Sequence, residues 1–177
     1  MTPLDGIGRL LIDGNNLLHR MSGNADPGSV RLLLAKLSGA IPDTTPTIVM
    51  FDGHAASGTD RQQRIRRGLD VQAAGSISAD EALLNIIRDT SASKRAAVTI
   101  VTDDRPLTEK ARHLGARTKR LEWLEQLLSA PSVSQATGIG RKGVKPPPST
   151  QAESEREPWS PGRGATKKKG NPKREKK

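Results

Sequence analysis

The chain has 177 residues, a formal charge of +10 and no cysteine. Without cysteine, the sequence excludes disulfides, thiol catalysis and zinc fingers with cysteine ligands. No apolar run approaches the roughly 18 residues that a membrane-spanning helix needs, so we expect a soluble, cytoplasmic protein with no membrane partner.

The positive charge is concentrated at the end of the chain. Residues 1–140 carry 17 Lys and Arg against 15 Asp and Glu, whereas residues 141–177 carry 12 against four. The terminal segment is rich in proline and glycine and has few apolar side chains, so it cannot bury enough surface to offset the entropy lost on ordering. We therefore expect one folded domain at 1–130 and a disordered basic tail at 131–177.

Short apolar segments alternate with amphipathic ones along the first 130 residues. Branched apolar runs that end at turn residues predict strands at 9–12, 46–51, 69–73, 96–101 and 116–118. Apolar residues at helical spacing predict helices at 29–40, 78–91, 105–114 and 120–128. This alternation predicts an α/β fold of three layers, α/β/α, around a mainly parallel sheet.

Acidic residues recur where the predicted strands end. Asp13, Asp52 and the pair Asp103 and Asp104 each follow a strand, and Asp80 lies at the start of a helix. Because the carboxyl ends of parallel strands share one edge, we expect these side chains to converge. Two carboxylates about 5 Å apart repel by roughly 3 kcal/mol at an effective dielectric near 20, so such a cluster needs cations. Oxygen ligands without His or Cys suit Mg²⁺ or Mn²⁺, which support phosphodiester hydrolysis.

Each acid also has a local structural explanation. Ser78 and Glu81 fit a capping box, in which Asp80 would only favour the helix dipole. Asp103 or Asp104 is suited to cap the helix that follows, and Asp-Gly pairs are common in turns. Single acids are therefore ambiguous, but their recurrence at equivalent positions favours a metal site.

Four segments, in this order, resemble the motifs of PIN-like nucleases, and most closely the NYN branch with its bacterial YacP-type proteins. They are LIDGNN at 11–16, VMFDG at 49–53, SADE at 78–81 and VTDDR at 101–105. The resemblance implies a Mg²⁺- or Mn²⁺-dependent endoribonuclease whose catalytic and metal-binding residues are Asp13, Asp80 and Asp104. It adds Asp103 as a further metal ligand, at a position where YacP-type proteins often have Ser. Asn16, on the first loop, and Asp52 would lie next to the ligands.

Basic residues offer phosphate contacts in the folded domain. Four arginines follow the strand that ends at Asp52, in a predicted loop or short helix on the acidic edge: Arg61, Arg64, Arg66 and Arg67. They are suited to grip phosphates, or they form a solvent-facing connection with Asp60 and Asp70 as partners. Arg105, beside Asp104, either contacts phosphate or pairs with Glu109 one helical turn later.

The tail carries a run of lysines, Lys167, Lys168 and Lys169, that is typical of a polyelectrolyte arm for RNA. The alternative is a tail that only keeps the chain soluble. A G-x-G-x-x-G sequence at 138–143 opens this tail instead of joining a strand to a helix, so we expect no nucleotide cofactor.

Aromatic side chains are too few for base stacking. Phe51 and Trp123 are predicted to lie in the core, so recognition of RNA should rest on backbone charge and shape. His54 is placed to approach the acidic edge, but an exposed loop histidine is the simpler interpretation.

The leading hypothesis is thus a metal-dependent endoribonuclease that acts on RNA, including ribosome-associated mRNA. The first alternative is a non-catalytic RNA-binding or ribosome-associated module with the same fold. The second is a nuclease specific for structured DNA.

Overall fold

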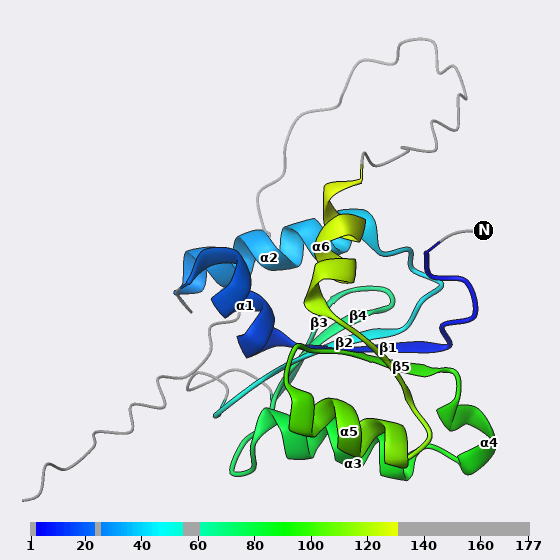
Figure 1. The fold of residues 1–177 in the computed structure, drawn as a ribbon. Helices are drawn as coiled ribbons and strands as arrows, with labels where there is room; N and C mark the ends of the chain where they lie inside the picture. Colours follow the sequence, from blue (N-terminus) through cyan, green and yellow to red (C-terminus); the bar gives the residue numbers. More distant parts are fainter. Residues whose placement is uncertain (1–2, 24–25, 55–60, 131–177) are drawn as a thin grey trace, which may run out of the picture.

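The computed structural model describes residues 3–23, 26–54 and 61–130. Within these ranges, six strands form one sheet in the order β3-β4-β2-β1-β5-β6 (Figure 1). All neighbouring strands are parallel except β3 and β4, which are antiparallel. The strands are β1 (Arg9–Asp13), β2 (Thr47–Phe51), β3 (Gln62–Arg66), β4 (Leu69–Ala73), β5 (Val98–Val101) and β6 (Arg117–Lys119).

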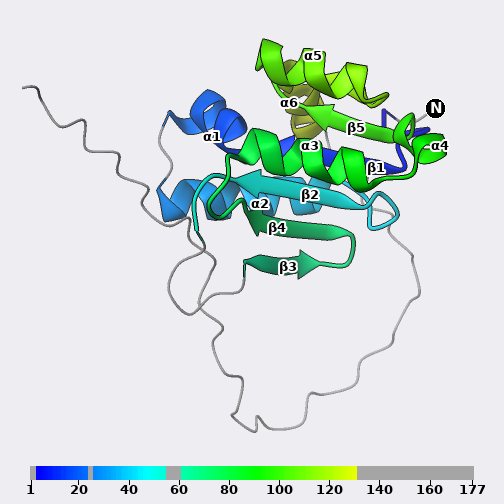
Figure 2. The same cartoon turned by 90° about the horizontal axis from the view of Figure 1, so that it is seen from below.

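Helices cover both faces of this sheet, which confirms the predicted three-layer α/β/α fold. The helices are α1 (Gly14–Ser22), α2 (Pro27–Ala40), α3 (Ala79–Asp89), the short α4 (Ala92–Arg95), α5 (Arg105–His113) and α6 (Leu121–Ser129). Helices α1, α2 and α6 lie on one face, and α3 and α5 lie on the other (Figure 1). Figure 2 shows α5 and α6 near one end of the sheet and β3 at the other end.

The central strand β1 explains why the core has two halves. Leu10 and Ile12 pack into the cluster under α1, α2 and α6, while Leu11 packs into the cluster under α3 and α5. Successive side chains of a strand point to opposite faces, so an unbroken apolar run is buried on both sides. Full burial of each such side chain contributes about 1.5–3 kcal/mol.

Two segments differ from the sequence prediction. Residues after Asp13, expected as a loop, form α1, with Leu17 and Leu18 buried. Its start was obscured because Gly14 and the two asparagines that follow are poor helix formers. Residues 62–66, expected as a loop or short helix, form the edge strand β3. Because β3 is exposed at the sheet edge, it lacks the apolar alternation that identifies strands.

The parallel strands bring the candidate site together. The carboxyl ends of β1, β2, β4, β5 and β6 lie at one edge of the sheet, where α1, α3 and α5 begin. We call this the carboxyl edge, and it contains Asp13, Asp52 and residues 102–104. The predicted tail at 131–177, with Lys167, Lys168 and Lys169, lies outside the described residues. None of the described helices is long and apolar enough to cross a membrane.

Candidate metal centre

Asp13 ends β1 and is the most deeply buried acid of the carboxyl edge, with 5% of its surface exposed. Its Oδ1 accepts a hydrogen bond from the Asn16 backbone N–H at 3.1 Å and thereby caps α1. Burial raises the pKa of Asp13, hydrogen bonds from Asn16 and Thr102 oppose this shift, and the charge of Asp52 adds to it. The Asp13 carboxylate is therefore held in one orientation, and burial destabilises its ionised form.

Thr102 connects this carboxylate to the next strand. Its hydroxyl donates to Oδ2 of Asp13 at 3.1 Å and accepts from the Asn16 side chain at 3.3 Å and from the Asp104 backbone N–H at 3.0 Å. Only 1% of Thr102 is exposed. The sequence interpretation did not select Thr102 as a site residue, although a hydroxyl between a buried strand and two acids was a usable signal.

Asp80 lies in the first turn of α3, and its carboxylate is repelled by the charges of three other acids. Burial raises its pKa above the ordinary value. The charges of three neighbouring acids raise it further, in the order Asp13, Asp104 and Asp52, and the charge of Lys110 opposes them. Among the described residues, no side chain or backbone group donates a hydrogen bond to the Asp80 carboxylate. The charges of three other acids therefore act on Asp80, and that of Lys110 offsets them in part.

Asp52 links two helix starts at this edge. Its Oδ1 accepts from the backbone N–H of Ala79, the first residue of α3, at 2.6 Å. Its Oδ2 accepts from the Asn15 side chain in α1 at 2.5 Å. Asp52 therefore fixes the beginning of α3 one residue before Asp80.

Asp104 caps α5 and still faces the acidic cluster. Its Oδ1 accepts from the Leu107 backbone N–H at 2.6 Å, and its backbone carbonyl accepts from the Thr108 hydroxyl at 2.7 Å. This confirms the capping role that was proposed for Asp103 or Asp104. The charge of Asp104 nevertheless raises the pKa of Asp80, so Asp104 both caps α5 and contributes to the negative charge around Asp80.

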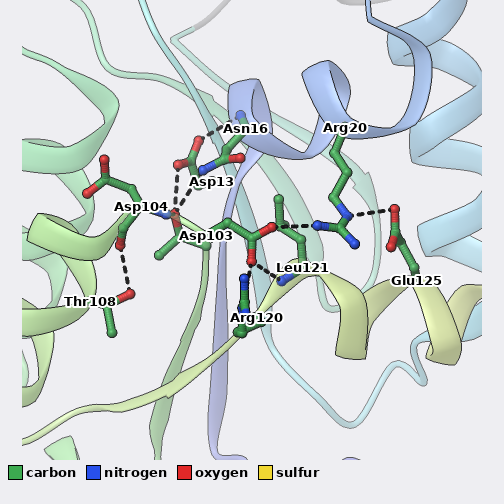
Figure 3. A network of polar contacts seen from close by, with 10 residues as sticks. Asp13, Asn16, Arg20, Asp103, Asp104, Thr108, Arg120, Leu121 and Glu125 are labelled. Atoms are coloured by element: carbon green, nitrogen blue, oxygen red, sulfur yellow. Dashed lines mark hydrogen bonds and ion pairs between the residues drawn. The ribbon is translucent and has the colours of Figure 1, made fainter.

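Asp103 has contacts that differ from its predicted metal role. Figure 3 shows its carboxylate directed toward Arg20 and the start of α6, away from Asp104. Oδ2 pairs with Arg20 at 2.8 Å, and Oδ1 accepts from the Leu121 backbone N–H at 3.1 Å and lies 3.4 Å from Arg120. Two arginines and a helix N-terminus compensate this charge, so we remove Asp103 from the candidate ligands.

The arginines of β3 also correct the sequence interpretation. Only Arg61 lies at the carboxyl edge, where it donates to the carbonyls of Ala73 and Ala74. Arg64 pairs with Asp70 at 3.2 Å, which is the predicted alternative.

The other two arginines of this run, Arg66 and Arg67, lie toward the opposite edge of the sheet. The Arg66 side chain is only 19% exposed and binds Asp43, Ser38 and the Ile41 carbonyl. Arg66 is therefore held by the protein itself, away from the acidic edge, whereas the Arg64 side chain is 73% exposed and uses only its Nε in the pair with Asp70.

Arg105 and the aromatic residues agree more closely with the sequence. Arg105 pairs with Glu109 at 3.1 Å, yet its side chain is 88% exposed at the start of α5. Phe51 is fully buried and Trp123 packs against the core, as predicted. The described residues thus offer charge, and no exposed aromatic surface, at the carboxyl edge.

The cluster suits a hard cation by its chemistry. Within residues 3–23, 26–54 and 61–130, no three His, Asp or Glu side chains are arranged as direct ligands of one ion. Mg²⁺ in proteins is commonly held by one or two carboxylates and keeps several waters, a mode that needs no such triad. Asp13 and Asp80 supply the two oxygen donors whose charge the fold disfavours, so the donor set fits this ion.

The fold is similar to that of a solved protein. No family model matches the chain, and no curated protein matches its sequence. The crystal structure of Rae1 (YacP) from Bacillus subtilis matches with a TM-score of 0.53 and 22% identity, over 67% of this chain and 72% of that one. A single-substitution variant of Rae1 (YacP) matches with a TM-score of 0.53 and 19% identity, over 68% and 73%. The described residues therefore have a fold like that of Rae1 (YacP), as the sequence resemblance predicted.

Proposed function

We propose that this chain is a metal-dependent endoribonuclease that hydrolyses RNA phosphodiester bonds at the carboxyl edge. The observation that carries the proposal is the Asp80 carboxylate, which lies in the field of three other acids without a hydrogen-bond or ion-pair partner in the described structure. Clusters with raised pKa values mark functional sites because a fold gains no stability from them. The similarity to the fold of Rae1 (YacP) supports the same function, because the sequence segments that resemble nuclease motifs, at 11–16, 49–53, 78–81 and 101–105, lie in the part of the chain that has this fold.

Asp13 and Asp80 would hold Mg²⁺ or Mn²⁺, with Asp104 oriented toward the same ion. When bound, such an ion lowers the pKa of water and stabilises the leaving oxygen of a phosphodiester. Asp13 is held by Asn16 and Thr102, so its position does not depend on substrate. Asp80 has no such bond, which leaves both of its oxygens available.

The remaining polar residues position these acids. Thr102 fixes the separation of Asp13 and Asp104 through its two opposed hydrogen bonds. Asp52 fixes the start of α3, and hence Asp80. A displacement of about 1 Å in such a group is enough to lower a rate about a hundredfold, so these contacts matter for catalysis as well as for folding.

A non-catalytic RNA-binding module is the second candidate. It is favoured by one observation, namely that no three acids are arranged as direct ligands among the described residues. Such a module would bind RNA, alone or on the ribosome, without breaking it.

A circular single-stranded RNA separates the two functions, because only an endonuclease converts it to a linear product. The full chain with Mn²⁺ should linearise the circle, and Asp80→Asn and Asp104→Asn should lose this activity. Glu81→Gln is the matched control, since Glu81 lies in the same helical turn but pairs with Arg88. Equal cleavage by all four proteins would reveal a contaminant and reject the enzyme. Binding without linearisation by the wild type would favour the module, and the same circle made of DNA tests the preference for RNA.

A further inference from the structure

The two ends of the sheet differ in how their basic residues are neutralised. At the β3 end, Arg64 pairs with Asp70 and Arg66 with Asp43, and the exposed Arg67 is the one arginine of residues 64–67 without an ion pair in the described structure. At the β6 end, four cations form no ion pair with any carboxylate of the described residues. They lie on α5 and β6, and we call them the β6-edge cations: Lys110, Arg112, Arg117 and Lys119.

These cations are exposed, and they flank one strand. Arg112 donates from its Nε to the Thr118 hydroxyl at 2.9 Å, which places it against β6 from α5. Lys119 lies over the Trp123 ring of α6, with its Nζ 5.7 Å from the ring centroid. Successive side chains of a strand alternate, so Arg117 shares the side of Lys119, and Thr118 faces α5. Positive charge therefore borders β6 on both sides.

This surface reaches the acidic cluster at one end. The Lys119 carbonyl accepts a hydrogen bond from the Thr102 backbone N–H at 3.1 Å, so β6 ends beside the residue that holds Asp13 and Asp104. Lys110 acts on the charge of Asp80 from the neighbouring helix. A polyanion that followed β6 toward the carboxyl edge would thus arrive at the proposed metal position.

Charged residues on an edge strand also prevent pairing between molecules. That requirement is met by the two cations of β6 alone, and it does not explain Lys110 and Arg112 on α5.

We propose that the β6-edge cations form the docking surface for the phosphate backbone of single-stranded RNA, leading it to the carboxyl edge. This rests on the proposed function for its substrate class, and it moves the RNA contact from β3, where the sequence placed it, to the opposite end of the sheet. The surface offers charge, and the Trp123 ring beside it is only partly exposed and lies under Lys119, so binding should depend on salt and only weakly on base sequence.

The test compares two full-length variants that each remove three positive charges. The first is Arg112→Gln, Arg117→Gln and Lys119→Gln, which spares Lys110 because of its influence on Asp80. The matched control is Arg31→Gln, Lys36→Gln and Lys94→Gln, exposed positions in α2 and α4. Binding of a fluorescent 20-nucleotide RNA is measured in EDTA, which prevents cleavage, between 50 and 300 mM KCl. Circular dichroism verifies that both variants are folded.

The first variant should bind RNA at least about tenfold more weakly than the control at 100 mM salt. Its slope of log K against log salt should be smaller by about 2, since each lost phosphate contact removes about 0.7 for a single strand. An equal loss in both variants would show a general charge effect and overturn the proposal. Wild-type affinity in the first variant, as expected if the surface serves an acidic protein, would overturn it too. Because cleavage is measured separately, weaker binding in a protein that never cleaves RNA would reject the enzyme and retain the docking surface.

Discussion

The hydroxyl of Thr102 donates to Oδ2 of Asp13 at 3.1 Å and joins residues that are 89 positions apart in the chain. The same oxygen accepts from the Asn16 side chain and the Asp104 backbone, so all of its hydrogen-bonding capacity is used inside the site. On β5, the strand that ends just before Thr102, the buried Thr99 hydroxyl has no partner among the described residues. The two threonines therefore form a natural pair for comparison.

Thr102→Val should destabilise the protein by about 1–3 kcal/mol, because it leaves buried polar groups without partners. Cleavage should fall about 10- to 100-fold, the usual effect of losing a group that orients a metal ligand. Thr99→Val is the control and should leave cleavage unchanged with equal or greater stability. Urea unfolding and RNA linearisation measure both effects. Equal behaviour of the two variants would contradict the role assigned to Thr102.

Asp80→Asn should abolish cleavage and raise the melting temperature of the metal-free protein. The raised pKa of Asp80 shows that its ionised form is disfavoured in the folded state, and asparagine removes that charge. Mn²⁺ should raise the melting temperature of the wild type by mass action, and raise that of the variant much less. A lower melting temperature of the variant in EDTA would mean that Asp80 serves the helix dipole and not a metal.

The metal-free protein should become more stable as the pH falls from 7 toward 4. The pKa values of Asp13 and Asp80 are raised above the ordinary 3.8, so the folded state takes up these protons before the unfolded state does. The gain begins as the pH falls through the raised values and is complete below 3.8. Below this point the trend reverses, because the pKa of Asp26 is lowered by its hydrogen bonds to Ser29 and that contribution is then lost. Urea unfolding in EDTA across this range should show a smaller gain in Asp80→Asn, and an equal gain would contradict the origin of the effect.

Asp52 offers a test that separates positioning from metal binding. Asp52→Ala removes the acceptor for Ala79 and Asn15, and should lower cleavage about 10- to 100-fold with a loss of about 0.5–2 kcal/mol in stability. Asp52→Asn should restore most of the activity, because the side-chain oxygen of the new asparagine can still accept from the Ala79 N–H. Its side-chain nitrogen can donate to the Asn15 carbonyl oxygen once the Asn15 amide is turned over. RNA linearisation measures both variants. If asparagine is as damaging as alanine, Asp52 acts through its charge, as a metal ligand does.

Much of the fold follows from the sequence, because burial on both faces has a distinct pattern. The continuous apolar runs of β1 and β5 predict central strands, and parallel strands bring their carboxyl ends together whatever the details of the loops. The placement of Asp13, Asp52 and Asp104 at one edge of the sheet was therefore predictable from topology alone. The edge strand β3 was not, since exposure removes the pattern that identifies a strand.

The role of individual charges was harder to predict, because it depends on partners that are distant in the sequence. Arg66 binds residues that precede β2, and nothing in its own segment indicates them. Asp103 and Asp104 are equivalent in sequence, and only the positions of Arg20 and Leu121 make the first of them an ion-pair partner.

The adjacent acids at the end of β5 show how finely the function depends on position. Asp103 ties α1 and α6 together, and the Asp104 carboxylate points away from that of Asp103, while its charge acts on Asp80 (Figure 3). Inserting one residue after Thr102 would move both acids along the chain by one position, so that neither kept its present partners. The two neighbouring carboxylates are therefore not interchangeable: Asp103 joins α1 to α6, whereas Asp104 caps α5 and acts on the charge of Asp80.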